Sequence, residues 1–515
     1  MNVKNHGGYL TVYMTMTLAV LLSLCLTMIE GARRSAMRME AELITDTAMR
    51  SVLAEYHREL MRQYNIFAID SSYGTSVCGI EQTSAHFRDY MEKNYSYDPP
   101  ASWVGYRDYI GARPESASVD AVVYLTDDSG RIFRECAIEA VKDDLGLTAA
   151  EEVIGWVTST ELTAADAMDV SAELNEGAAN VSSAASAEMN RRRTEREEQE
   201  KGYEEACAAA DEEGAPHPEE PEYTELPAEY DSPVSQVSAS AGTGILGLLL
   251  DDTENLSRRM LDTDAVISGR ASDGNINVGE AGCMDTENDP AQQALEKALF
   301  GEYLMRYMGR FGDVDEDDAM WYQIEYLIAG KNVDAENLNS VALRILGLRA
   351  GMDMLYLETD TGKKAEAEAL AATICTVCMI GWMTPVLTHT ILLAWALLEA
   401  RYDTSTLLTG GKIPFIKDSS NWHCDLDSLL TGSFSGGDNG SSSGLEYKDY
   451  LRIFLYMTDT EKLTFRAMDI IESDIRLSEG NSKFRMDACM EMIECSAVIT
   501  SSFGSRVSIK RKMKY

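Results

Sequence analysis

Three glycines match the pattern of a loop that binds a dinucleotide. Gly242, Gly244 and Gly247 fit GxGxxG, in which the missing side chains let the backbone approach a pyrophosphate at a helix start. A dinucleotide-binding fold needs a strand directly before this loop, whereas here a segment rich in Pro and Ser precedes it. We therefore favour a flexible entry to a helix and predict no cofactor.

A second pattern resembles the turn that exposes a catalytic serine. Gly440 to Gly444 matches GxSxG with Ser442 as the nucleophile. That chemistry needs a strained turn between a strand and a helix, and a histidine and an acid beside it. The flanking residues are Gly, Ser, Asp and Asn, so the match arises from low complexity, and Gly432 to Gly444 is predicted to be a loop.

An acidic run resembles the start of a calcium-binding loop. Asp313, Asp315 and Asp317 alternate as the oxygen ligands of an EF-hand do. The sixth position of such a loop is Gly and the twelfth is Glu, but here they are Asp318 and Ile324. The sequence does not support an EF-hand.

Cysteine and histidine spacing gives no metal site. Cys375 and Cys378 have CxxC spacing, but they stand in an apolar run without a second CxxC, so small buried side chains are the favoured interpretation. The six histidines form no HExxH or HxxxH pair. We predict no catalytic, cofactor-binding or metal-ligating residue and expect a protein that is not an enzyme. An envelope hydrolase would need a cluster that no spacing here predicts.

Composition narrows the class of partner. The chain has 515 residues, enough for two or three domains, and 45% of them are hydrophobic. Its formal net charge of −40 argues against nucleic acid as a partner, because phosphate binding needs clustered Lys and Arg. The ten cysteines follow no repeating spacing, so no disulfide scaffold is predicted.

The stretch from Tyr9 to Ile29 carries no charge over 21 residues. A helix of this length spans about 30 Å, the thickness of the hydrocarbon core of a bilayer. A cleaved signal peptide usually ends in a small-x-small site, whereas this stretch runs into Glu30-Gly31-Ala32. We predict a retained, single-pass anchor with membrane lipid as its partner.

The charges that flank the anchor do not decide on which side of the membrane the large domain lies. Lys4 precedes it, while Arg33, Arg34 and Arg38 follow it. The positive-inside rule would place the large domain in the cytoplasm, but that rule is statistical.

Beyond the anchor, apolar residues recur at helical spacing, and one helix is predicted from about Tyr9 to Arg62. The members of this stripe are Ala41, Ile44, Ala48, Val52, Tyr56 and Leu60. Strands are predicted at Tyr64–Asp70 and Val119–Thr126, with helices at 81–94 and 132–145. A terminal strand at Arg506–Tyr515 is predicted to pair with the strands near 64 and 119.

From 242 to 480 the pattern is mainly helical. Helices are predicted at 246–262, 290–311, 318–330, 334–358, 362–383, 386–402, 446–457 and 459–478. The uncharged run Ala369–Leu398 is long enough for a second membrane span, but Thr384-Pro385 splits it. A buried hairpin is the favoured interpretation.

The predicted fold class is mainly α, of the α+β type. It has an N-terminal transmembrane helix that continues as a long amphipathic helix, a small antiparallel sheet and a large helical domain. The predicted parts are a short leader (1–8), the transmembrane helix (9–29), a pilin-like helix with an α/β region (30–160), a solvated helix and linker rich in Pro, Glu and Ser (161–240), a helical domain with the buried hairpin 369–398 (241–480), and a C-terminal helix or strand that returns to the sheet (481–515).

Several stretches together resemble an uncharacterised family of Gram-positive bacterial membrane proteins, which is similar to the TadE/TadG-like pseudopilins of tight-adherence (Flp) pili. They are Gly8-Tyr-Leu-Thr-Val-Tyr13, Glu30-Gly-Ala-Arg33, Ser51 to Leu60, Tyr64 to Asp70, Glu325 to Lys331, Trp395 to Ala400, Gly411 to Lys417 and Gly444 to Leu451. The resemblance covers most of the chain except roughly 160–235. The resemblance rests on the order of these stretches, because each one alone is a weak match.

This resemblance implies a cytoplasmic leader processed at Gly8 and Tyr9, a pilin-like helix and a large domain outside the membrane. The implied partners are other pilus-assembly or envelope proteins, with oligomers formed through the N-terminal helix. Substrates of prepilin peptidase carry Glu five residues after the Gly, whereas Tyr13 stands there. A permanently anchored accessory protein therefore fits better than a major pilin. The alternative is a membrane-tethered sensor or scaffold with a cytoplasmic helical domain.

Overall fold

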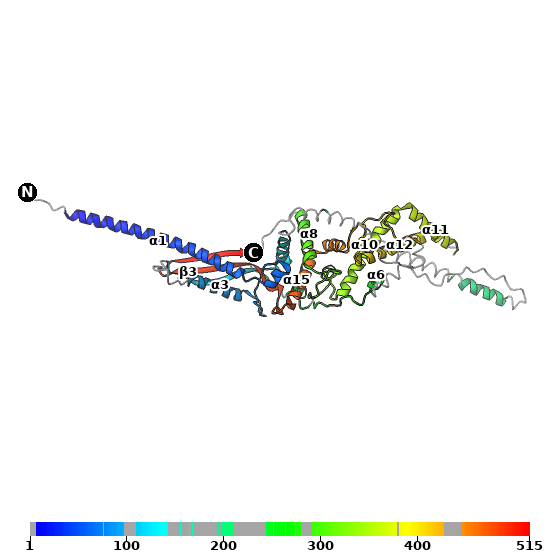
Figure 1. Ribbon diagram of the computed structural model, residues 1–515, viewed down its shortest axis with the longest axis horizontal. Helices are drawn as coiled ribbons and strands as arrows, with labels where there is room; N and C mark the ends of the chain where they lie inside the picture. The colour runs from blue at the N-terminus through cyan, green and yellow to red at the C-terminus, as the bar shows by residue number, and fades with distance from the viewer. Residues whose placement is uncertain are drawn as a thin grey trace, which may run out of the picture. The chain divides into compact units, whose positions relative to one another are not determined.

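The structure is a computed structural model of the chain (Figure 1). It describes residues 7–75, 77–96, 110–142, 155, 164, 167, 194, 197–209, 244–250, 252–262, 264–272, 274, 276–279, 290–377, 381–426 and 444–515. Within these residues the protein is mainly α-helical, with a small antiparallel sheet and a long apolar helix near the N-terminus. The predicted fold class is confirmed.

The chain divides into two compact units, each made of separate segments. Unit 1 comprises Met1–Asp144, Asp262–Pro290 and Thr464–Tyr515. Unit 2 comprises Leu145–Leu261 and Ala291–Leu463. In each unit, segments that are separated in the sequence by residues of the other unit pack together.

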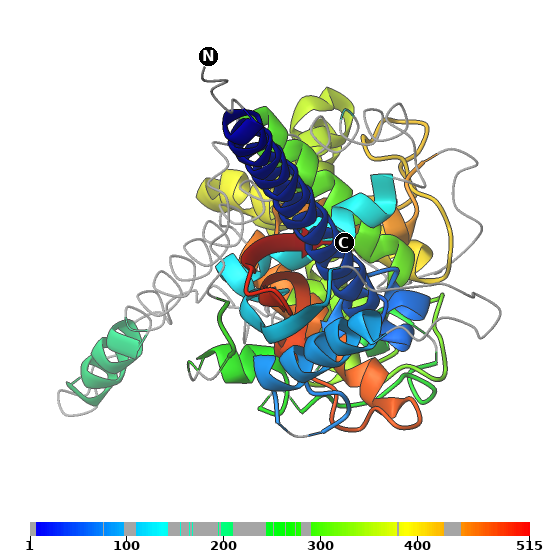
Figure 2. The same cartoon turned by 90° about the vertical axis from the view of Figure 1, so that its left-hand side faces the viewer.

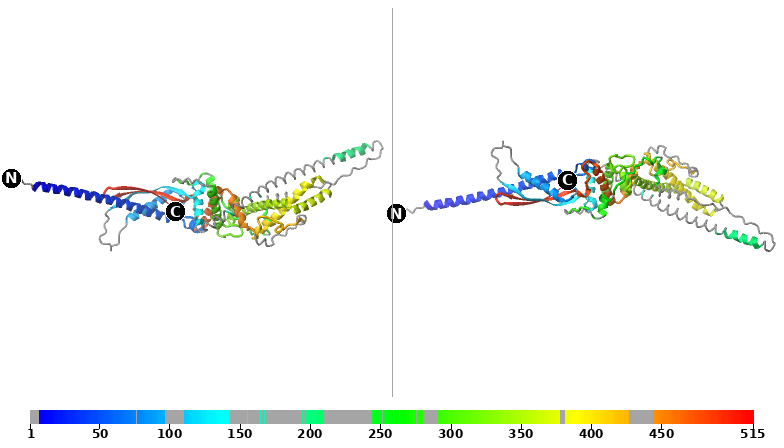
Figure 3. Two further views of the ribbon diagram at one scale, coloured as in Figure 1. Left: turned by 90° about the horizontal axis from the view of Figure 1, so that it is seen from above. Right: turned by 90° about the horizontal axis from the view of Figure 1, so that it is seen from below.

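Unit 1 is built on a long helix that packs against a sheet (Figures 1 and 2). Its elements are α1 (Gly7–Leu53), α2 (Arg58–Tyr64), β1 (Ile69–Asp70), α3 (Ile80–Tyr95), β2 (Ala112–Tyr124), α7 (Ile267–Ser272), most of α15 (Thr460–Leu477), η2 (Met486–Ala488), β3 (Cys489–Ser501) and β4 (Arg506–Lys514). In both views of Figure 3 the first half of α1 extends beyond the sheet. Only the second half of α1 packs against the sheet and α3.

β3 is the central strand of the sheet. One edge of β3 pairs with β2 from Ser501 to Met490, and the other edge pairs with β4 and with β1, all antiparallel. The C-terminal strand was predicted correctly, but it pairs with β3 and not with the strands near 64 and 119.

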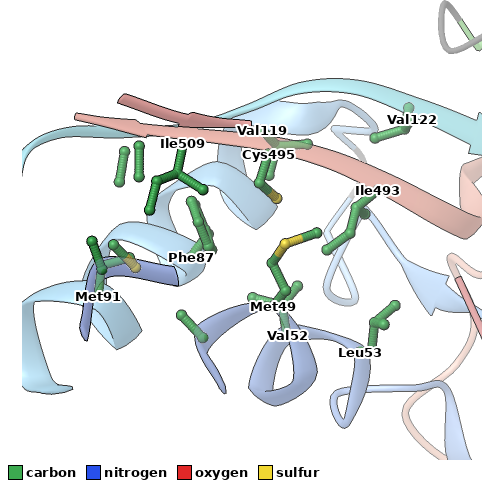
Figure 4. Close-up of a cluster of buried hydrophobic side chains, with 14 of the residues drawn as sticks. Met49, Val52, Leu53, Phe87, Met91, Val119, Val122, Ile493, Cys495 and Ile509 are labelled. Carbon is green, nitrogen blue, oxygen red and sulfur yellow. The ribbon is translucent and has the colours of Figure 1, made fainter. Parts of the chain in front are cut away.

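The core of unit 1 lies between this sheet and the two helices α1 and α3. Buried side chains of α1 recur every three or four residues, which is why one face of the helix faces the sheet. Figure 4 shows side chains of the helices pointing toward those of the strands, among them Met49, Val52, Leu53, Phe87, Met91, Val119, Val122, Ile493, Cys495 and Ile509.

Three predicted elements in unit 1 have wrong boundaries. The first helix ends at Leu53 and not at Arg62, because the backbone N–H of His57 bonds to Ala68 while the His57 side chain caps α2. The strand predicted at Tyr64–Asp70 is reduced to Ile69–Asp70, because Asn65 takes a left-handed conformation that ends α2. The strand predicted at Val119–Thr126 begins earlier, at Ala112, since β3 offers it partners over its whole length.

Unit 2 is helical in the residues that the structure describes. Its elements are α6 (Leu246–Leu249), α8 (Pro290–Tyr307), α9 (Gln323–Ala329), α10 (Asp334–Thr359), α11 (Thr361–Val377), η1 (Gly381–Met383), α12 (Thr384–Leu408) and α14 (Tyr447–Met457). The helix predicted at 246–262 is wrong beyond Leu249. The chain there bonds to the start of α10 instead, for example through Leu261 N–H to Asn332 O at 2.9 Å.

The apolar run Ala369–Leu398 forms a helical hairpin of α11 and α12 around the predicted break at Pro385. Ala371 of α11 shares a core with Trp395 of α12, and Cys375 of α11 is also buried. The hairpin is buried only in part, because Ile374 and most of its neighbours on α11 face outward. A helix that packs one face on its partner leaves the other face exposed.

Candidate functional site

The first half of α1 is an uncovered apolar helix. The large apolar side chains from Tyr9 to Ile29 are between 55% and 82% exposed. In the described part of the chain, α1 is the one helix long and apolar enough to cross a membrane, over Tyr9–Leu53. Length and composition of this kind are shared by membrane anchors and signal sequences.

Three threonine hydroxyls of this half form hydrogen bonds within the helix. The hydroxyls of Thr15, Thr17 and Thr27 donate to the carbonyls of Val12, Tyr13 or Met14, and Leu24, at 2.8–3.1 Å. In a hydrocarbon environment every polar group needs a partner inside the protein. These hydroxyls would therefore not oppose burial in lipid.

Gly8 and Tyr9, the predicted processing residues, lie in the first turn of α1, and Tyr9 is 82% exposed. The peptide bond between Gly8 and Tyr9 therefore precedes the whole apolar stretch. Processing at this bond stays a prediction.

Unit 2 holds a group of charged side chains in its interior, here called the buried ionic cluster. It consists of Arg349, Asp353, Glu399, Asp403 and Lys417, whose side chains have no exposed area. α10 supplies Arg349 and Asp353, and α12 supplies Glu399 and Asp403, each pair four residues apart. This spacing places both members of a pair on one helix face.

Two cations bridge the two helices. A terminal nitrogen of Arg349 lies 3.1 Å from Asp353 and 2.6 Å from Asp403. Lys417 Nζ lies 2.9 Å from Asp403 Oδ1 and 2.6 Å from Glu399 Oε1. Breaking a buried pair leaves an uncompensated charge, so the cluster holds α10, α12 and the segment after α12 in one arrangement.

The cluster contains three carboxylates and two cations, and its pKa shifts follow from this imbalance. Burial strongly raises the pKa of Asp353, although Arg349 opposes the shift. Its Oδ2 atom is buried and accepts no hydrogen bond. Both observations favour a protonated Asp353, which leaves two negative charges facing two positive ones.

Glu399 and Lys417 stay charged. Burial alone would raise the pKa of Glu399, but hydrogen bonds from His423 and Lys417 lower it to about 2. Burial also works against the charge of Lys417, but the neighbouring carboxylates, Asp403 first, outweigh it and raise the pKa of this ammonium.

Glu399, Asp403 and His423 place one ligand atom each within 4.8 Å of one another, a spacing that could hold a metal ion. The ammonium of Lys417 already lies between the two carboxylates. A metal would have to displace this cation, so the geometry favours a structural ionic group.

Cys424 gives no nucleophile beside His423. Burial first, and then the charge of Glu399, raise the pKa of the Cys424 thiol. A catalytic cysteine needs the opposite shift, toward the thiolate. In the described residues each of the eight cysteines is a free thiol.

The motifs considered in the sequence do not assemble into a site. Gly242 and Gly440 to Ser443 lie outside the described residues, and the helix after Gly244 has a single turn, Leu246–Leu249. Asp313 pairs with Arg310, and burial raises the pKa of Asp318 to about 6. Cys375 is buried, while Cys378 is outside the described residues.

The buried ionic cluster was missed by the sequence reasoning. A usable signal was present, since charged pairs four residues apart interrupt otherwise apolar helices at Arg349/Asp353 and Glu399/Asp403. A charge that faces a core needs a partner there.

These features define a mainly α-helical protein that carries an exposed apolar helix on a small sheet and a helical unit with an ionic core. Residues 223–501 match a family of unknown function (DUF5702), and because the match covers more than half of the chain, the protein belongs to this family. No curated protein and no solved structure matches the chain.

Proposed function

We propose that this protein is a single-pass, non-enzymatic component of the cell envelope. In this proposal it is an accessory, pseudopilin-like subunit of a pilus assembly system of the tight-adherence type. It acts through protein contacts, with the large domain outside the cell and α1 fixed in the membrane.

The observation that carries the proposal is the difference between the two halves of α1. One continuous helix exposes a 21-residue apolar stretch, Tyr9–Ile29, and then packs its second half on an antiparallel sheet. Buried residues such as Ala41, Ala48 and Val52 have no counterpart in the first half. Pilin-like subunits use a helix of this kind to hold a globular domain at the membrane and to pack laterally with other membrane helices.

Tyr13 argues against a pilin that enters the filament. A pilin that enters a filament carries an acid at this position, and Tyr13 is instead an aromatic side chain with 67% of its surface exposed. We therefore place the protein beside the filament, as a subunit that stays in the membrane.

The test is photocrosslinking from α1 in cells that coexpress the platform proteins of such a pilus. A benzoylphenylalanine at Leu26, which is 65% exposed, should capture a membrane partner. The matched control is Leu43 on the same helix, with 64% exposure but outside the apolar stretch. Absence of any protein adduct at Leu26 in cells that form pili would contradict the pilus role.

The arginines after the apolar stretch favour a second candidate, a membrane-tethered scaffold whose large domain faces the cytoplasm. Arg33, Arg34 and Arg38 follow the stretch, against Lys4 before it. A cysteine introduced at Leu477, which is 61% exposed in unit 1, distinguishes the two orientations. Labelling of intact cells by an impermeant maleimide supports the envelope protein, and labelling only after lysis supports the scaffold. The unmodified chain measures the background.

A further inference from the structure

The turn between β3 and β4 lies against α1 where the apolar stretch ends. The hydroxyl of Ser505 donates to Oε1 of Glu30, the first charged residue after the stretch, at 3.3 Å. The guanidinium carbon of Arg33 lies 3.4 Å from the ring centroid of Phe503. The turn is thus fixed to α1 at the level of its first charges.

This contact sets the depth of Phe503 relative to a membrane. Arg33 is four residues beyond Ile29, which corresponds to about 6 Å along a helix. The headgroup region on each side of a bilayer is about 5–8 Å thick. If Tyr9–Ile29 spans the hydrocarbon, Phe503 lies in the headgroup layer.

Phe503 is also the kind of side chain that this layer accepts. It is 61% exposed although Arg33 covers one face of its ring. Phe is among the apolar side chains that amphipathic segments at a membrane surface bury at the boundary between headgroups and acyl chains. The turn is held in place from the other side too, because the backbone N–H of Ser502 donates to Gly111 at 2.9 Å.

Arginines gather at this end of unit 1. Arg33 and Arg34 stand on α1, while Arg113 and Arg506 flank Thr500 on the two strands beside β3. The acids that pair with them in the described residues are Glu30 and Glu115, two glutamates against four arginines. The chain as a whole has a net charge of −40 and would be repelled by an anionic surface.

We propose that Arg33, Arg34, Arg113, Arg506 and Phe503 form a lipid-binding collar that contacts the anionic phospholipid headgroups of the bilayer in which α1 is anchored. The proposal rests on the membrane anchoring proposed above. Phe503 enters the headgroup layer, and the arginines bind the phosphates. Arg34 and Arg506 can do so because their side chains are 69% and 64% exposed, in ion pairs that water already screens.

The test uses the full chain in nanodiscs that contain phosphatidylcholine alone or a mixture with phosphatidylglycerol. A benzoylphenylalanine at Phe503 replaces one aromatic side chain by another, and it should form a lipid adduct. The matched control is Leu477, also 61% exposed in unit 1, which is near Ser478 and Gln63 and so beyond the other end of α1. The control should form no adduct.

The electrostatic part is tested by the triple change R34Q/R113Q/R506Q, with R58Q/R88Q at exposed positions of α2 and α3 as the control. Each basic residue near an anionic surface contributes about fivefold. The preference of the Phe503 adduct for phosphatidylglycerol should therefore fall by about fivefold or more in the triple variant and stay unchanged in the control.

Flotation with vesicles separates this inference from the anchoring on which it depends. A chain that floats but gives no lipid adduct at Phe503 overturns the collar and leaves the anchor intact. A chain that does not float overturns both. A Phe503 adduct without preference for the anionic lipid, in a chain that floats, also overturns the collar.

Discussion

Lys417 holds its ammonium 2.6 Å from Oε1 of Glu399, and neither side chain has any exposed area. The same ammonium lies 2.9 Å from Asp403, so one cation compensates two carboxylates of α12. Removing it should leave both carboxylates buried without that compensation.

We expect Lys417→Met to destabilise unit 2 by about 3–5 kcal/mol, the usual cost of an unpaired buried charge. Thermal unfolding followed by tryptophan fluorescence measures this, since Trp321, Trp395 and Trp422 all lie in unit 2. Lys364→Met on the exposed face of α11 is the control and should change stability by less than about 0.5 kcal/mol. Equal effects of the two changes would show that the cluster contributes nothing.

Glu325 should make the stability of unit 2 depend on pH. Burial raises its pKa to about 7 from 4.5, although a hydrogen bond from Tyr447 opposes the shift. The folded state therefore binds the proton more tightly than the unfolded state, and stability falls as the pH rises from about 4.5 to about 7. The full fall is on the order of 3 kcal/mol.

Glu325→Gln should remove this dependence, because the amide oxygen can still accept from Tyr447 and from the N–H of Phe311. Unfolding at pH 5 and pH 8 compares the two chains. Glu336→Gln, at an exposed position of α10, is the matched control and should keep the slope of the unmodified protein. A slope that survives in the Glu325 variant would rule out this residue as its source.

The two faces of the second half of α1 should respond differently to the same change. Met49 is fully buried against the sheet, and Met39 is 72% exposed on the same helix. We expect Met49→Ala to cost about 2–5 kcal/mol and Met39→Ala less than about 0.5 kcal/mol. Hydrogen exchange of α1 and β3 peptides reports on unit 1 directly. Similar losses at both positions would argue against the packing of α1 on the sheet.

Gly130 should tolerate no side chain. Its φ is +73°, and a Cβ placed there would lie 2.5 Å from Cγ2 of Thr464. Gly274 has nearly the same φ, +70°, but open space around it. Gly274→Ala should cost about 1–2 kcal/mol for the left-handed conformation alone, and Gly130→Ala about 1–3 kcal/mol more for the clash. The difference between the two unfolding free energies isolates the clash.

Local patterns in the sequence were sufficient for most of the helices, though not for all of their ends. The stripe Ala41, Ile44, Ala48 and Val52 predicts the face of α1 that is buried, because a helix repeats every 3.6 residues. The break at Pro385 likewise predicts the start of α12, since proline suits the first turn of a helix.

Features that depend on distant partners were not predictable in this way. β3 was not predicted as the central strand, because Cys489–Ser501 begins with Met, Glu and Cys and only partly alternates. The buried ionic cluster joins Arg349 to Asp403, 54 residues away, and the sequence does not say which charges meet. A helix boundary such as that at Leu53 was set by the bond from His57 to Ala68, which is also a tertiary contact.

The central place of β3 has a consequence for the order in which the protein can fold. The buried face of α1 is synthesised first, but the strand that completes its core begins only at Cys489, after most of unit 2 has been made. Contacts between segments so far apart form slowly. Until the end of the chain has been made, the apolar stripe of α1 lacks the strand that covers it, and transiently exposed surface of this kind promotes aggregation.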